Sequence, residues 1–252
     1  MNSPKIYQNQ DVFFAYMDIL GFKNLILNNE NEYLSNLYTD VLDKIVLKGI
    51  TNRKSEYFGD DARFAMINSL VISDSIMLWT NHDNIWGLLE ITEATRIILS
   101  EGMKAGIPLR GIVTKGPIIF QKKENENHNF DVGRITLVGK ALVKAYTEEG
   151  IYDWSGCVIS EDCINLWKNG VIEYYLKDAR KHNIYVDYLS PVKNKNKEGE
   201  VVIEEKMMTS VNWTSGISRS QVEWAFSAHN KGTDKRKLIH TLLFYDQMMS
   251  LE

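Results

Sequence analysis

The sequence predicts an α+β fold with one main, mostly antiparallel sheet. Segments typical of strands and helices follow in the order strand, helix, helix, strand, strand, helix, strand, strand, helix, strand, which is close to a split βαβ arrangement. No internal repeat and no linker rich in Pro, Gly or Ser divides the 252 residues. We therefore expect a core over residues 11–160 and a C-terminal elaboration over residues 161–252 that packs on the same domain.

The first strands are expected before residue 80. Val12–Met17 is apolar and aromatic throughout, as in a strand buried on both faces. Apolar residues then recur at helical spacing between Leu34 and Val46. Phe64–Ile72 and Ile76–Trp79 resemble two strands joined by a short polar turn around Asp74.

The middle of the chain alternates between the two patterns. Ile85–Leu99 has the spacing of a helix. Leu109–Val113 and Pro117–Phe120 are typical of strand material on either side of Lys115-Gly116. Residues 121–133 are polar and lack a core pattern, which predicts a flexible arm or a long hairpin tip.

The last elements are less regular. Ile135–Val138 and Cys157–Ser160 predict strands, and a helix is expected from Gly139 to about Glu149 with three side chains facing inward: Leu142, Ala145 and Tyr146. The charged stretch 190–206 reads most simply as a solvated loop. A final amphipathic helix is expected at about Lys235–Met249.

Composition narrows the class of protein. The net charge is −4, with 44% hydrophobic and 25% charged residues, so general basicity does not predict a nucleic-acid partner. Cys157 and Cys163 do not form a CxxC pair, which favours two reduced thiols. No stretch approaches the ~18 apolar residues of a membrane span, and the N-terminus lacks an apolar signal core. We expect a cytoplasmic protein without a membrane partner.

Two isolated acids suggest a metal site. Asp18 ends the apolar run in "VFFAYMDILGF", and Asp74 lies between apolar arms in "LVISDSIMLW". Carboxylates are the usual ligands of Mg²⁺ and Mn²⁺, and a pair of such ions assists phosphoryl transfer. The Ile19 carbonyl could add a ligand, and Gly21 leaves room for a triphosphate beside the backbone amides of the turn. The plainer alternative is a helix cap at Asp18 and a simple hairpin turn at Asp74.

A second acidic motif competes for the same role. "FGDDARF", residues 58–64, imitates a polymerase metal hairpin, but its polar flank favours a surface turn. A palm-type polymerase would also need a basic template channel, which this acidic chain does not supply.

Three segments carry a resemblance to a known family. They are "FFAYMDILGFKNLI", "VISDSIMLW", and "LRGIVTKGPI" followed by "GRITLVGKALVKAYTEEG". In order and spacing they resemble the class III nucleotidyl cyclases, particularly the bacterial pyrimidine cyclases of the Pycsar anti-phage systems. The resemblance implies a ferredoxin-like α+β domain that works as a homodimer, with active sites between subunits.

The resemblance also assigns roles. It implies that Asp18, Asp74 and the Ile19 carbonyl hold two Mn²⁺ or Mg²⁺ ions. It implies that the main-chain amides through Leu20, Gly21 and Phe22 hold the β- and γ-phosphates. The 3′-hydroxyl of a nucleoside triphosphate would then attack the α-phosphorus and expel pyrophosphate, and the cyclic product would act on a cyclic-nucleotide-activated effector.

The departures from the family indicate the base. Where adenylate cyclases have a base-reading Lys and Asp, this chain has Leu70 and Thr136. Their absence argues against ATP and favours UTP, or CTP, as substrate.

The departures also affect catalysis. The usual transition-state Asn and Arg align with Val143 and Thr147, which leaves open a catalytically silent nucleotide-binding module. Charge on the phosphates still requires a cation. The candidates are Arg110, Lys115, Arg134, Lys140 and Lys144, of which Arg110 and Lys144 are preferred.

Overall fold

The computed structural model describes residues 11–51, 67–127, 130–165, 177, 181, 184–232 and 234–251. The side chains of residues 123–134 are outside this description. The "FGDDARF" motif and the first residues of the expected strand 64–72 also lie outside the described residues.

One eight-stranded sheet organises the chain, in the order β2-β3-β1-β4-β6-β8-β7, with β5 paired to β4. The strands are β1 (Asp11–Ile19), β2 (Ile67–Ile72), β3 (Ser75–Thr80), β4 (Leu109–Asn127), β5 (Phe130–Gly139), β6 (Gly156–Ile159), β7 (Tyr185–Lys195) and β8 (Val201–Val211). The β4–β6 pair is parallel and the other strand pairs are antiparallel. The prediction of an α+β fold with one main, mostly antiparallel sheet is confirmed.

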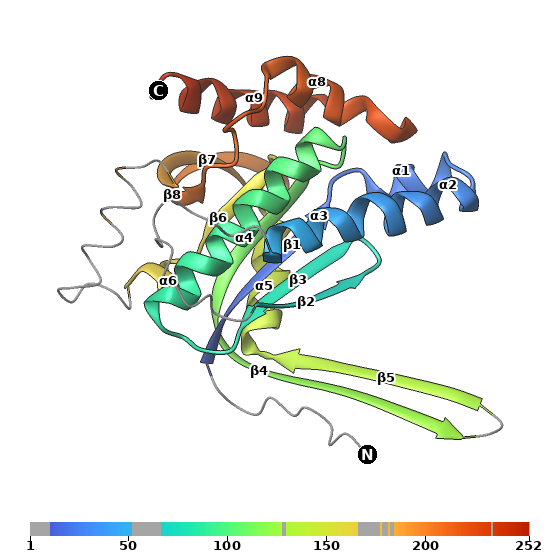
Figure 1. Cartoon of the computed structure of the whole chain (residues 1–252). Coiled ribbons are helices and arrows are strands. Elements are labelled where there is room, and N and C mark those ends of the chain that lie inside the picture. Colours follow the sequence, from blue (N-terminus) through green and yellow to red (C-terminus); the bar gives the residue numbers. More distant parts are fainter. Residues whose placement is uncertain are drawn as a thin grey trace.

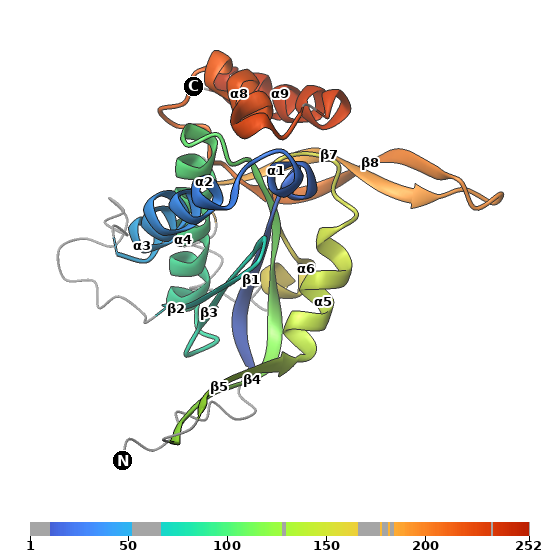
Figure 2. The same cartoon turned by 90° about the vertical axis from the view of Figure 1, so that its right-hand side faces the viewer.

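Helices cover both faces of this sheet (Figures 1 and 2). They are α1 (Phe22–Leu27), α2 (Asn31–Asn36), the π-helical turn η1 (Leu37–Leu42), α3 (Asp43–Thr51), α4 (Ile85–Lys104), α5 (Lys140–Glu149), α6 (Glu161–Asn165), α8 (Arg219–Ser227), the 3₁₀ turn η2 (Ala228–Asn230) and α9 (Lys235–Met249). Figure 2 shows α4 and α5 on opposite sides of β1 and β4. Within the described residues, no helix is both long and apolar enough to cross a membrane.

Strand β1 is buried on both faces, as its continuous apolar sequence predicts. Its odd-numbered side chains face α4, where a Cβ added to Gly87 would lie 3.4 Å from the Phe13 ring. Its even-numbered side chains face α5, where the rings of Tyr16 and Tyr146 meet edge to face. Asp18 therefore points to the α5 face, since side chains alternate along a strand.

Residues 109–120 form strand as expected, and the hairpin that was one of two alternatives for residues 121–133 is the projecting β4–β5 pair (Figure 1). Two other expectations about the elements are wrong. The stretch 190–206 is part of the β7–β8 hairpin rather than a solvated loop, because the two strands pair over their whole length despite their charge. Tyr146 is 68% exposed rather than inward.

The C-terminal segment adds a helical layer at one end of the sheet (Figure 1). Helix α8 begins with a capping box: the Ser218 hydroxyl accepts from the Gln221 N–H, and the Gln221 side chain accepts from the Ser218 N–H. Helix α9 packs through Phe244, whose ring lies 4.6 Å from that of Trp154 and 5.9 Å from that of Trp213. The boundary at residue 160 stays a prediction, although β7 and β8 extend the main sheet.

Candidate active site

The two isolated aspartates meet at one end of the sheet. Asp18 lies opposite Ser75, so the end of β1 runs beside the β2–β3 turn that carries Asp74. The Ile19 N–H donates to the Asp74 carbonyl at 3.1 Å, and the Asp74 side chain is close enough to raise the pKa of Asp18. Ser73 has φ = 55°, which tightens this turn. Residues 56 positions apart are therefore neighbours, because antiparallel pairing fixes the turn against the strand end.

The Asp18 carboxyl group is unusually hard to ionise. Its pKa is raised from 3.8 to about 7, mainly by burial, then by the charge of Glu149 and by the hydrogen bond and charge of Asp74. Arg110 opposes this shift. Two carboxyl groups in contact favour a shared proton, or a cation, between them.

Arg110 and Glu149 complete the cluster. The Arg110 guanidinium donates through Nε to Glu149 in a short ion pair and through Nη1 to the Tyr152 carbonyl at 2.9 Å. Its Nη2 lies 3.7 Å from the Asp18 carboxylate. The pKa of Glu149 is raised because burial outweighs the attraction of Arg110. Three acids thus face one arginine, and this surplus of negative charge favours a divalent cation.

Glu149 was missed in the sequence, where it appeared only as the end of a helix. The signal lies in its spacing with Ala141 and Ala145, since the three buried residues of α5 recur at intervals of four. This spacing puts Glu149 on the face that packs against the sheet.

The turn after Asp18 is close to what the sequence predicts. Gly21 has φ = 80°, a conformation that glycine adopts without strain. The Leu20 N–H already donates to the Pro108 carbonyl at 3.0 Å, so it is used within the fold. Gly21 and Phe22 remain as candidates for contacting phosphate.

Leu70 lies on the same face of the sheet as Asp18. It is opposite Met77, which is opposite Tyr16, and residues directly opposite each other on paired strands share a face. Thr136 pairs with Gln121 in the projecting β4–β5 hairpin, beyond the part of β4 that pairs with β1.

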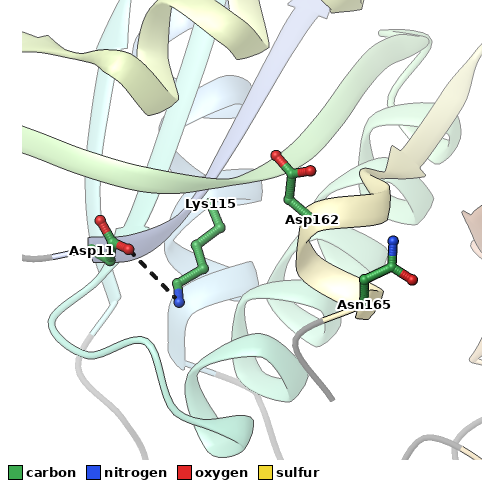
Figure 3. A pocket seen from close by; sticks show the side chains of 4 residues that line it. All are labelled: Asp11, Lys115, Asp162 and Asn165. Atoms are coloured by element: carbon green, nitrogen blue, oxygen red, sulfur yellow. Dashed lines mark ion pairs between the residues drawn. The ribbon is translucent and has the colours of Figure 1, made fainter. Parts of the chain in front are cut away.

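One other candidate cation, Lys115, lines a separate hollow of about 420 Å³, together with Asp11, Asp162 and Asn165 (Figure 3). Lys115 pairs there with Asp83 at 2.7 Å and with Asp11 at 3.8 Å. Lys144 forms a short ion pair with Asp162.

The site geometry therefore favours Arg110 over Lys144 as the cation near the aspartates. Lys140 is exposed at the start of α5. The Arg134 side chain lies outside the described residues.

The positions of the usual Asn and Arg lie on the outer side of α5. Val143 is 65% exposed, and the Thr147 hydroxyl donates to the Val143 carbonyl at 2.8 Å. Neither side chain supplies a charge.

The residues present fit a pair of divalent ions of the magnesium type. Within the described part of the chain, no group of three or more His, Cys, Asp or Glu side chains is arranged to hold a metal ion. Asp18 and Asp74 nevertheless offer adjoining carboxylate oxygens, and main-chain and phosphate oxygens can complete the coordination of such hard ions. The raised pKa of Asp18 also fits, because a cation would relieve the repulsion between the two carboxylates.

Comparisons with solved structures identify the architecture. No family model matches the sequence, and no curated protein matches it. A bacterial light-regulated adenylyl cyclase superposes with a TM-score of 0.51 at 12% identity, over 97% of this chain and 58% of its own. A second structure of a bacterial light-regulated adenylyl cyclase gives 0.50 at 13% identity, over 98% and 59%.

The catalytic core of a rhodopsin-guanylyl cyclase with converted specificity gives a TM-score of 0.48 at 14% identity, over 84% of this chain and 100% of its own. For the two light-regulated enzymes, the match covers 58% and 59% of their chains, so this chain spans less than two thirds of their length. At these identities, the likeness to the light-regulated enzymes establishes a shared fold.

Proposed function

We propose that this chain is a class III nucleotidyl cyclase that converts a pyrimidine nucleoside triphosphate, UTP or CTP, into its 3′,5′-cyclic monophosphate and pyrophosphate. The observation that carries the proposal is that Asp18 and Asp74 lie side by side at the end of β1, where Asp18 is opposite Ser75 and the Ile19 N–H donates to the Asp74 carbonyl. The two motifs that resemble the family most specifically meet at this point.

The first task of the chain's own residues in this reaction is to hold the metal ions. Asp18, Asp74 and the Ile19 carbonyl hold two Mn²⁺ or Mg²⁺ ions. When bound, these ions activate the 3′-hydroxyl and neutralise charge on the phosphates.

The main-chain amides of Gly21 and Phe22 would contact the triphosphate. The Lys231 side chain fills the space beside the Gly21 Cα, so Gly21 serves the φ = 80° conformation of the turn rather than making room for the phosphates, as the sequence had suggested. Arg110, 3.7 Å from Asp18, lies within reach of phosphates bound at this carboxylate and stabilises negative charge on the leaving pyrophosphate.

The uncharged residues Leu70 and Thr136 support a pyrimidine substrate. A pocket that binds adenine specifically needs hydrogen-bond donors and acceptors that match the polar edge of the base. A base whose polar edge finds no matching groups is strongly rejected. Leu70 lies on the Asp18 face of the sheet, where it offers an apolar contact to a base. We prefer UTP to CTP on the strength of the sequence resemblance alone.

Exposed apolar side chains support a homodimer. Ile72, Val143 and Tyr146 are 52%, 65% and 68% exposed. Ile72 is opposite Ser75, which is opposite Asp18, and the other two lie on α5. A second copy covering this face would bury these side chains and enclose the site. The product would act as a second messenger in anti-phage defence, through an effector that binds cyclic nucleotides.

The direct test uses the purified chain. Each of the four nucleoside triphosphates is incubated with Mn²⁺, and cyclic nucleotide and pyrophosphate are measured. We expect product from UTP or CTP, and a loss of about 100-fold or more in Asp74→Asn, with the fold checked by circular dichroism. Product from ATP alone would contradict the pyrimidine assignment.

A silent nucleotide-binding module is the second candidate. It is favoured by the uncharged Val143 and Thr147 on α5, where the family has Asn and Arg. It predicts metal-dependent binding of a nucleoside triphosphate without release of pyrophosphate at any metal concentration.

A further inference from the structure

Arg110 is held close to Asp18 but short of full contact. Its Nη2 is 3.7 Å from the carboxylate, whereas a charge-assisted hydrogen bond measures about 2.7–2.9 Å. Glu149 and the Tyr152 carbonyl, which accepts from Nη1 at 2.9 Å, hold the guanidinium there. Both partners belong to the segment 149–153, so the position of this segment sets the distance between Arg110 and Asp18.

That segment is anchored from outside by helix α9. Asp153 is fully buried, and Arg236 donates to both of its carboxylate oxygens, from Nε at 2.6 Å and from Nη2 at 3.0 Å. His240 Nδ1 lies 2.9 Å from the Asp153 carbonyl. The Thr241 hydroxyl accepts from the Ser155 N–H at 2.8 Å.

Arg236 and His240 lie four positions apart on α9 and so share one face of the helix, and Thr241 follows directly after His240. A bidentate arginine pair on a buried carboxylate fixes both distance and orientation. The 149–153 segment is therefore held from two sides: by the side chains of α9, and by the backbone of β7, where the Asp153 N–H donates to the Pro191 carbonyl at 3.0 Å and the Lys193 N–H to the Ile151 carbonyl at 2.7 Å.

We propose that Arg236 of α9 is a positioning residue for the metal site, which acts through Asp153 and the Tyr152 carbonyl to keep Arg110 from closing on Asp18. This inference rests on the proposed function, since it assigns Asp18 to metal binding. An arginine in direct contact with Asp18 would occupy the oxygens that a divalent cation requires. The C-terminal elaboration thereby keeps the carboxylate open.

The chain offers a matched pair of variants. Arg236 is 54% exposed at its side chain, so Arg236→Gln removes the bidentate pair without opening a core cavity. Arg219 of α8 is 51% exposed and pairs with Asp246 of α9 at 3.3 Å. Arg219→Gln thus removes a similar arginine from the same helical pair without touching the 149–153 segment.

The first readout is the affinity for Mn²⁺ alone, measured by electron paramagnetic resonance of the free ion. We expect Arg236→Gln to weaken binding about fivefold and Arg219→Gln to leave it unchanged. The comparison is repeated in Arg110→Gln/Glu149→Gln, which removes both buried charges together. There Arg236→Gln has no further effect if it acts through Arg110. A persisting loss, an equal loss in Arg219→Gln, or no loss at all overturns the inference.

The second readout needs neither metal nor turnover. It is the NMR chemical shift of the Arg110 Nε–H group. This signal is assigned by its absence from the double variant or from Arg110→Lys. It should change in Arg236→Gln and stay the same in Arg219→Gln. An unmoved signal in Arg236→Gln overturns the inference. If the wild-type protein binds no Mn²⁺ and forms no cyclic nucleotide, the proposed function fails by itself. The Arg110 signal then still decides whether Arg236 positions it.

Discussion

Replacing Asp18 by Asn should stabilise the metal-free protein at alkaline pH. The pKa of this carboxyl group rises from 3.8 to about 7 on folding. A raised carboxyl pKa contributes stability that is fully present below 3.8 and is lost as the pH rises through about 7. At pH 8 the ionised group therefore opposes folding. Asparagine keeps the shape and can donate its amide to Asp74, but it carries no charge.

The size of the effect follows from the shift. A tenfold change in an equilibrium constant corresponds to ~1.4 kcal/mol, so a shift from 3.8 to about 7 corresponds to about 4 kcal/mol as an upper value. For a chain of this length, we expect a midpoint of thermal unfolding roughly 8–16 °C higher for Asp18→Asn at pH 8. Near pH 4 the two proteins should unfold together, because Asp18 is then protonated in the folded state.

The assay is thermal and urea unfolding of both proteins in EDTA at pH 4, 6 and 8, with Asp11→Asn as an exposed-acid control. Adding Mn²⁺ at pH 8 should stabilise the wild type more than Asp18→Asn, because the variant keeps Asp74 but loses one of the two carboxylate ligands. An Asp18→Asn variant that is less stable than the wild type at pH 8 without metal refutes the reasoning. It would mean that Arg110 and the ionised Asp18 stabilise one another more than burial costs.

Three further predictions concern the structure around the site. Gly21→Ala should destabilise the protein by ~1–2 kcal/mol, because φ is 80° and a Cβ would lie 3.3 Å from Lys231 Cδ. If urea unfolding gives the variant the same stability as the wild type, the turn rearranges freely and this reasoning is wrong. Lys231→Met should lower the free energy of unfolding by ~2–3 kcal/mol, because the buried Lys231 ammonium donates to three carbonyls. The control is Lys235→Met, at an exposed lysine. Equal effects of the two variants on urea unfolding would contradict this reasoning. Cys157 and Cys163 should not react with a thiol reagent in the native protein, since both are fully buried and burial raises the pKa of each thiol. Both should react rapidly in urea. Rapid labelling of the native protein would mean that this part of the core opens.

The order of elements was predictable because it depends on local periodicity. The apolar run of β1 and the helical spacing of α4 each reflect burial of one segment against the whole core, which a single sequence records. The β7–β8 hairpin was not predictable in this way. Its strands carry charged side chains on their exposed faces, and only their mutual pairing identifies them.

The candidate site divides in the same way. Asp18 and Asp74 stand out in the sequence because an acid within an apolar run is costly to bury and needs a reason. The sequence by itself thus determined the succession of strands and helices along the chain up to β6, and the two acidic positions.

Only the tertiary structure decided the partners of these acids. Glu149 and Tyr152, which hold Arg110 near Asp18, come from the segment 149–153, and Arg236, which holds that segment, comes from α9. They converge through strand register and helix packing, which act between segments far apart in the chain. Charge surplus and pKa depend on those distances, so the electrostatics of the site emerges only once the chain has folded.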